Sequence, residues 1–192
     1  MVKKREAIDA QYQWDLTTIF ATDAVFEAEL ADVLTALEDA RSLAGTLTNS
    51  AETLLAVTET ELALMQEVEK LYVYASMKND QDTTVSLYQE YQAKVTALYA
   101  KFSEVFAFYE PEFMTLSQAT FAQFVIDQPK LQTYGHFFKQ LFDRKAHVLS
   151  SAEEALLAGA SEIFGAGAET FEILDNADIV FPTIQDAQGQ EV

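Results

Sequence analysis

The scarcity of helix-breaking residues is the feature that most constrains this fold. The stretch from Met1 to Glu110 contains one glycine, Gly45, and no proline, and the whole 192-residue chain has six glycines and three prolines. Because so little interrupts a helix in such a sequence, long helices are expected. The sequence therefore predicts a mainly α-helical fold, an array of long antiparallel helices followed by shorter helices.

Three long helices are predicted from apolar residues at helical spacing. Capping or terminating residues stand at their expected ends: Thr22 or Asp23 before the first, Gly45 after it, Asn49 with Glu52 at the start of the second, Asp82 before the third and Pro111 after it. The predicted apolar stripes are Phe26, Leu30, Val33, Leu34 and Leu37; Leu55, Leu62, Met65, Val68, Leu71, Tyr72 and Ala75; and Tyr88, Tyr91, Val95, Leu98, Phe102, Val105, Phe106 and Tyr109.

Shorter helices and a β element follow along the chain. Ser117 precedes one helix, and Pro129 fits the first position of the next. A third begins at a capping box, Ser150 with Glu153 or Ser151 with Glu154, and Leu149 can act as a hydrophobic staple. The stretch 178–184 is rich in β-forming residues, and Gly189 suits the turn after it, so the chain is predicted to end on the start of a β-hairpin.

Composition narrows the function classes. The net charge of −19 repels nucleic-acid phosphates and anionic lipid headgroups, so neither is an expected partner. The chain has no cysteine, no signal peptide and no apolar run long enough to span a membrane, which together predict a soluble cytoplasmic protein.

Catalytic motifs are not found. A zinc peptidase helix requires His-Glu-x-x-His, and neither His136 nor His147 begins that pattern. The residues three positions before these histidines, Thr133 and Arg144, exclude the Glu-x-x-His motif of a di-iron site. No nucleophile elbow or phosphate loop occurs either. The sequence therefore predicts no catalytic, cofactor-binding or metal-binding residue within this chain.

Three weaker candidates have more ordinary explanations. Asp80 and Asp82 can share a cation, although carboxylates in a helix–helix turn more often cap. His147 beside Arg144 and Lys145 can be functional, although a surface or capping role is more common. An aromatic series can line a peptide groove, although such spacing more often fills a core: Tyr72, Tyr74, Tyr88, Tyr91, Tyr99, Phe102, Phe106, Phe108 and Tyr109.

Several segments together resemble the N-terminal part of oligoendopeptidase F, a zinc peptidase of the thimet oligopeptidase group. The resemblance spans nearly the whole chain and lies in the order and spacing of its segments. They are Trp14-Asp15-Leu16 with Ile19-Phe20; Leu71-Tyr72-Val73-Tyr74-Ala75 with Asp80 and Asp82; Arg144 to Ser150 with Glu153 to Ala158; and Phe171, Leu174, Asn176 to Ile179, Phe181-Pro182 and Gly189.

The resemblance implies a domain organisation and a role. Residues 1–21 would form an N-terminal arm, residues 22–175 a helical domain that is part of a channel wall, and residues 176–192 the start of a hairpin leading to a catalytic domain outside this chain. The zinc ligands and the catalytic glutamate would lie in that domain, and short peptides would be the substrates. This chain alone is expected to be inactive, and its role would be to shape the channel and restrict access.

Two alternatives remain open at this stage. The chain can instead be a free-standing helical interaction module, or a truncated peptidase remnant without activity. A wall taken from a larger enzyme should expose a contiguous apolar patch, whereas a self-sufficient module should not.

Overall fold

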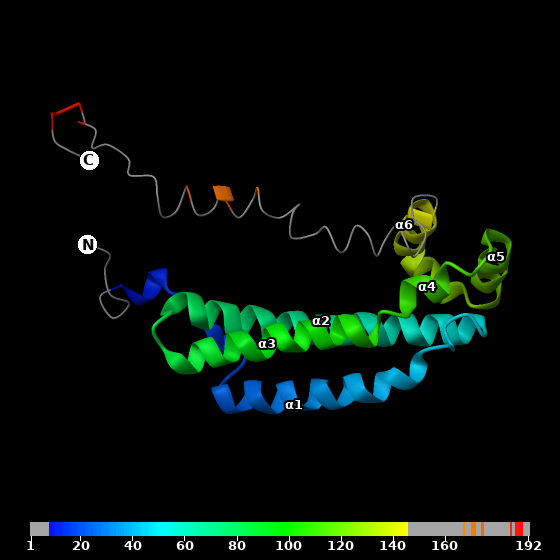
Figure 1. Ribbon diagram of the computed structural model, residues 1–192, viewed down its shortest axis with the longest axis horizontal. Coiled ribbons are helices and arrows are strands. Elements are labelled where there is room, and N and C mark those ends of the chain that lie inside the picture. The colour runs from blue at the N-terminus through cyan, green and yellow to red at the C-terminus, as the bar shows by residue number, and fades with distance from the viewer. Residues whose placement is uncertain are drawn as a thin grey trace. The chain divides into compact units, whose positions relative to one another are not determined.

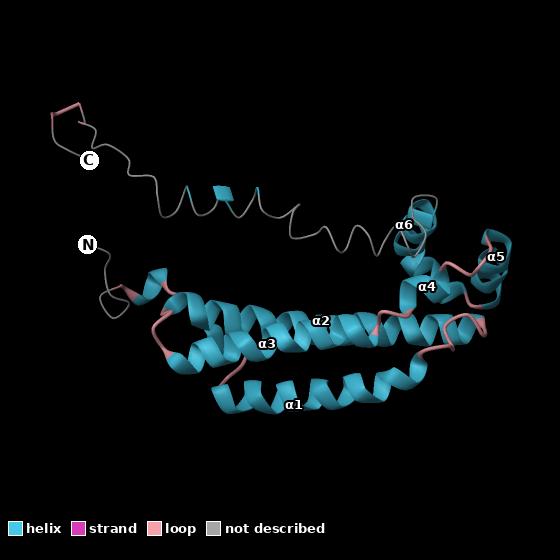
Figure 2. Cartoon of the chain, viewed as in Figure 1, coloured by secondary structure: helices cyan, strands magenta, loops and turns pink. Residues whose placement is uncertain are grey.

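The computed structural model of the chain describes residues 8–145 and, further on, residues 167, 170, 171, 174, 185 and 187–189. The chain divides into two compact units, residues 1–145 and 146–192, which are considered separately. The described residues form helices and loops, with no extended strand among them (Figure 2). The mainly helical prediction is confirmed. The predicted domain boundaries stay predictions.

Three long helices dominate the first unit. They are α1 (Asp23–Ala40), α2 (Ala51–Gln81) and α3 (Ser86–Val105), and they lie side by side along their lengths (Figure 1). Short connections reverse the chain between consecutive helices, so α2 runs antiparallel to both α1 and α3. Two 3-10 turns, η2 (Ala10–Tyr12) and η3 (Leu16–Thr18), precede them.

Of the three capping residues predicted for the long helices, one is confirmed and two are wrong. Thr22 caps α1 by accepting a hydrogen bond from the Val25 amide at 3.3 Å. Ser50, not Asn49, caps α2. Asp82 ends α2 and does not cap α3, because its carboxylate accepts hydrogen bonds from the amide and hydroxyl of Thr84 and closes the turn between the two helices.

The ends of the long helices also differ from expectation. After α1 the chain forms a 3-10 turn, η4 (Arg41–Leu43), and Gly45 follows it with a φ of +81°. Helix α3 ends at Val105, so Pro111 does not stop it but lies inside α4 (Tyr109–Phe113). Pro111 is the third residue of α4, where an amide hydrogen would have no partner within the helix.

The remaining elements of this unit are short. They are α5 (Gln118–Asp127), η5 (Pro129–Tyr134) and α6 (Gly135–Lys145). Ser117 precedes α5, as predicted, and caps it by accepting a hydrogen bond from the Thr120 amide at 3.0 Å. Pro129 occupies the first position of η5, which is a 3-10 helix leading into α6 and not the start of one continuous α-helix.

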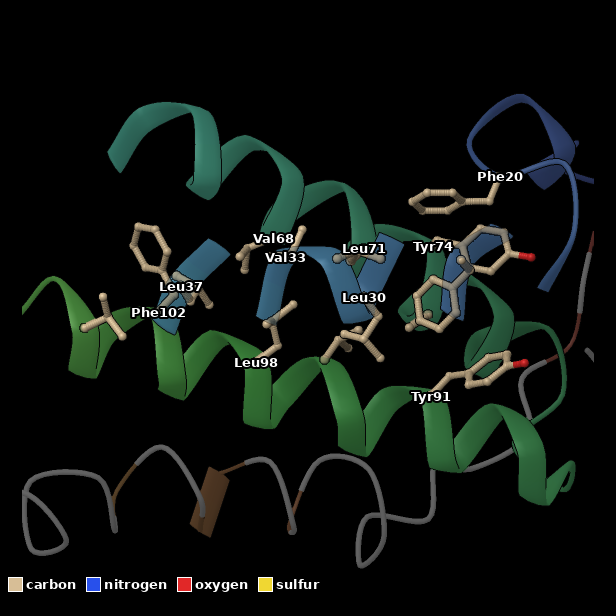
Figure 3. Packing of buried hydrophobic residues seen from close by; sticks show 14 of the residues in the cluster. Phe20, Leu30, Val33, Leu37, Val68, Leu71, Tyr74, Tyr91, Leu98 and Phe102 are labelled. Carbon is tan, nitrogen blue, oxygen red and sulfur yellow. The ribbon is translucent and has the colours of Figure 1, made fainter. Parts of the chain in front are cut away.

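Two hydrophobic cores meet along α2. The first lies where the C-terminal half of α2 packs against α1 and α3, which also contact each other (Figure 3). The second packs the N-terminal half of α2 against α4, η5 and α6. Most predicted stripe residues are buried, but Leu34, Leu62 and Tyr72 keep about two fifths of their surface exposed. One long helix thus organises the whole unit and presents part of its outer face to solvent.

The described residues at the far end of the chain include a turn at residues 187–189. Gly189 has a φ of +77° and lies in a turn with residues 187 and 188, which agrees with the turn predicted from sequence. The predicted capping box at residues 150–154 and the predicted strand at 178–184 lie outside the described residues.

Candidate functional site

The aromatic series predicted on α2 and α3 divides into core and surface residues. Tyr74, Tyr91, Phe102, Phe106 and Tyr109 are buried, and Tyr88 and Phe108 are half-buried. Two tyrosines differ: Tyr72 is 41% exposed and Tyr99 is 37% exposed. The core interpretation therefore holds for most of the series, and a surface role is confined to these two.

Tyr72 on α2 and Tyr99 on α3 both line an open groove between these helices. Their ring centroids lie 6.1 Å apart with the ring planes at 67°, an edge-to-face contact between the two helices. The groove has a volume of about 720 Å³, and its lining is mostly apolar: Glu69, Tyr72, Val73, Thr96, Tyr99 and Ala100. Steps of three and four residues place these side chains on one face of each helix. Such a surface suits recognition of an apolar partner.

A half-buried carboxyl group lies near the start of α4, and the sequence analysis missed it. The Oε2 atom of Glu61 is buried without a hydrogen-bond partner among the described residues. Burial and then the nearby charge of Glu110 raise the pKa of Glu61 to about 7. Glu110 itself pairs with Arg144 at 2.7 Å. Glu61 follows Thr58 by three residues and precedes Met65 by four, on the inner stripe of α2. This helical spacing was the signal in the sequence that its side chain faces inward.

A second polar cluster ties the start of α1 to the end of α2. Asp23 Oδ1 accepts a hydrogen bond from the Tyr74 hydroxyl at 2.7 Å and pairs with Lys78 Nζ at 3.0 Å. The Lys78 ammonium also lies 5.4 Å and 5.2 Å from the ring centroids of Tyr74 and Tyr88. Burial acts to raise the pKa of Asp23, but the Tyr74 and Lys78 contacts outweigh it and hold that pKa below its ordinary value. This cluster is fully paired, which favours a structural role.

The candidate metal ligand Asp82 has a hydrogen-bond partner in the structure. The Asp82 carboxylate accepts hydrogen bonds from the hydroxyl and amide of Thr84, and these bonds lower its pKa and close the turn between α2 and α3. His136 is exposed at the start of α6, and His147 lies outside the described residues. Within the part of the chain that the structure describes, no three histidine, aspartate or glutamate side chains are grouped to hold a metal ion.

The described helices also bear on membrane association. None of them combines the length and apolar character needed to cross a bilayer.

The fold and the groove define a class: a helical domain with an apolar surface suited to an interaction. Comparison with known proteins narrows that class. A family model described as Oligopeptidase F matches residues 112–181. The group B oligopeptidase PepB of Streptococcus agalactiae is 58% identical over 192 residues, which are 100% of this chain and 32% of that protein. The oligopeptidase PepF of Bacillus subtilis is 35% identical, covering 97% of this chain and 28% of that protein.

A solved structure agrees with these sequence matches. The crystal structure of oligoendopeptidase-F from Enterococcus faecium aligns with 88% of this chain and 33% of its own, at a TM-score of 0.65 and 40% identity. The chain matches the N-terminal part of oligoendopeptidase F proteins. It spans about a third of the length of the curated relatives it matches.

Proposed function

We propose that this chain is the N-terminal, non-catalytic portion of a zinc metalloendopeptidase that hydrolyses short peptides inside a channel. In this role it forms part of the channel wall and restricts which substrates enter. Its partners are the catalytic domain of the same polypeptide and the short peptides that the whole enzyme cleaves. A cytoplasmic location goes with this proposal, because a chain with no cysteine suits a reducing compartment.

One observation carries the proposal. A protein named as an oligopeptidase is 58% identical to this chain from end to end, yet the chain spans only 32% of that protein. Identity at this level across a whole domain goes with a shared fold. Catalytic activity, by contrast, depends on the residues of the active site. We therefore propose that the catalytic residues lie in the remaining two thirds of the longer protein.

The zinc of the proposed enzyme does not fit the residues of this chain. Its two histidines, His136 and His147, are eleven positions apart in the sequence and do not form His-Glu-x-x-His. Among the described residues no group of three suitable side chains converges. The metal and its ligands are accordingly placed in the catalytic domain, and the chain's own contribution is one of shape.

Comparing this chain with the full polypeptide of its gene tests the proposal. Both proteins are incubated with short quenched fluorescent peptides, alone, with a zinc chelator, and after zinc is added back. The full polypeptide is expected to cleave the peptides in a zinc-dependent manner, and the 192-residue chain is expected to cleave none. The same peptide sequence embedded in a tightly folded protein should be spared, because a channel admits short peptides only.

Two results would overturn the proposal. Zinc-dependent cleavage by the purified chain, surviving a repeat purification, would place the catalytic site in this chain. A full polypeptide without peptidase activity would remove the enzyme assignment altogether.

The alternative to the channel wall is a chain that acts alone, as a helical interaction module or as an inactive remnant. The exposed apolar groove between α2 and α3 favours the wall, because a self-sufficient module should not expose such a patch. An antibody against this chain, applied to extracts of the source cells, distinguishes the two. A single species at 21.4 kDa would support the alternative, and a species several times larger would support the channel wall.

A further inference from the structure

We propose that the groove between α2 and α3 is the docking surface for an amphipathic helix supplied by the catalytic portion of the polypeptide. This inference rests on the proposed function and names the face through which the two portions associate. It commits to one partner, a helix with an apolar face.

The groove extends along α3 well past the two tyrosines. A second hollow of about 600 Å³ is lined by Asn79, Gln89, Gln92, Ala93, Thr96, Ala97 and Ala100. Thr96 and Ala100 line both hollows, so the two adjoin each other on α3. From Gln89 to Ala100 an α-helix rises about 17 Å, or roughly three turns. That length matches a helical partner of about three turns.

The floor of the groove is built from small side chains. Ala93, Ala97 and Ala100 are exposed and follow each other at steps of four and three residues along α3. Helices pack by fitting ridges of side chains into grooves, and small side chains at the contact shorten the distance between the two axes. The backbone of a second helix can therefore approach α3 closely along this line.

The walls of the groove supply the larger apolar surface. Tyr72, Val73 and Tyr99 are 41%, 44% and 37% exposed, and Tyr72 and Val73 are adjacent on α2. Aromatic rings of this kind are typical anchors at protein interfaces, because they bury a large area with few rotatable bonds. A helix lying on the alanine floor would cover all three side chains.

The charge distribution favours this partner over a second copy of the chain. Among the described lining residues of both hollows, Glu69 alone is charged, although the chain carries a net charge of −19. A solvent-facing helical surface normally carries charged side chains. Two copies of so acidic a chain repel each other, whereas a segment with a lysine or arginine beside Glu69 complements it. The relatives supply the length for such a segment, since this chain spans 32% of one of them.

Cysteine labelling tests the docking surface directly. The chain has no cysteine, so Ala97→Cys places a single thiol on the groove floor, and Ala28→Cys places a matched thiol on the exposed side of α1. Each variant is made in the 192-residue chain and in the full polypeptide, where any other cysteine is replaced by serine. The rate of reaction with a maleimide is then measured.

The thiol of the Ala97→Cys variant is expected to react at least tenfold more slowly in the full polypeptide than in the chain alone, while the Ala28→Cys variant reacts equally in both. Equal rates for Ala97→Cys in a full polypeptide that cleaves peptides would overturn the docking proposal and leave the proposed function intact. Protection that develops only with saturating peptide, or only with rising concentration of the chain alone, would overturn it in favour of a peptide or a second copy.

A charge variant gives an independent measurement. Ala97→Asp is expected to lower the melting temperature of the full polypeptide by several degrees and to leave that of the 192-residue chain unchanged, because position 97 is exposed there. Ala28→Asp is the control and should change neither protein. Equal effects of the two aspartates on the full polypeptide would contradict the assignment of this face.

Discussion

The hydroxyl groups of Thr58 and Tyr109 lie 2.6 Å apart and join α2 to α4 inside the fold. Thr58 is fully buried and donates its own hydrogen to the Leu54 carbonyl oxygen at 2.7 Å. The Tyr109 hydroxyl is therefore the donor to Thr58. The second core thus contains one polar link, and each group in it is satisfied.

Because Tyr109 donates to Thr58, the loss of one hydroxyl group should destabilise the protein more than the loss of the other. Thr58→Val leaves the Tyr109 hydroxyl buried without an acceptor and should lower the free energy of unfolding by about 1–3 kcal/mol. Tyr109→Phe removes that hydroxyl while Thr58 keeps its bond to Leu54, so the loss should be about 0.5–1.5 kcal/mol. Urea denaturation of the two single variants and the double variant measures the difference. A Thr58→Val loss no larger than that of Tyr109→Phe would contradict this geometry.

The half-buried Glu61 should make stability fall as pH rises. Its pKa is raised from an ordinary value of 4.5 to about 7 in the folded protein. Between these values the folded state holds a proton that the unfolded state has lost, so the free energy of unfolding decreases through this window. Glu61→Gln mimics the protonated form and should be more stable than the wild type at about pH 8, by on the order of 1 kcal/mol.

The pH profile separates this effect from a simple loss of charge. The advantage of Glu61→Gln should shrink as pH falls and vanish near the ordinary pKa of a glutamate. Both variants are made in the 192-residue chain alone, where Glu69→Gln, at an exposed position of the same helix, removes one charge without relieving burial and serves as the control. A gain of equal size at every pH, or an equal gain from Glu69→Gln, would show that titration of Glu61 is not its cause.

The helices were predictable because their signals are local. Apolar spacing placed the inner faces of α1, α2 and α3, and hydroxyl residues marked the starts of α1 and α5. The prediction that Asp82 caps α3 was wrong because an aspartate near a helix end can accept hydrogen bonds within the turn as well as cap the following helix. Pro111 was misread for a related reason, since a proline tolerated in a first turn looks the same in sequence as one that stops a helix.

The sites were less predictable because their partners are distant in sequence. Asp23 and Tyr74 are 51 residues apart, and only the packing of α1 on α2 brings them together. The exposure of Tyr72 beside a buried Leu71 depends on how α2 and α3 are rotated against each other. The apolar stripe read from a helix sequence is wider than the surface that contacts the neighbouring helices. Residues at the edge of the stripe can therefore be either buried or exposed.

The Asp23 cluster should weaken at low pH. The folded-state pKa of Asp23 is depressed, so its contribution is complete above the ordinary value of 3.8 and is lost as pH falls through the lower folded value. Asp23→Asn should cost about 1 kcal/mol near neutral pH. That difference should disappear in strong acid. Asp32→Asn, at an exposed position on α1, is the control. A cost that persists unchanged into acid would point to lost packing and not to lost charge.

Two glycines with open surroundings should respond to alanine in opposite directions. A Cβ added at Gly45 or at Gly135 meets no atom within 4 Å, so steric crowding does not determine the effect of either substitution on stability. Gly45 has a φ of +81°, where an L-residue is strained, and Gly45→Ala should lower the free energy of unfolding by about 1–2 kcal/mol. Gly135 has a helical φ of −56°, and Gly135→Ala should raise it by about 0.5–1 kcal/mol by restricting the unfolded chain. Thermal and urea denaturation of both variants measure the contrast. A gain of stability in Gly45→Ala would refute the backbone assignment at Gly45, and a loss in Gly135→Ala would refute that at Gly135.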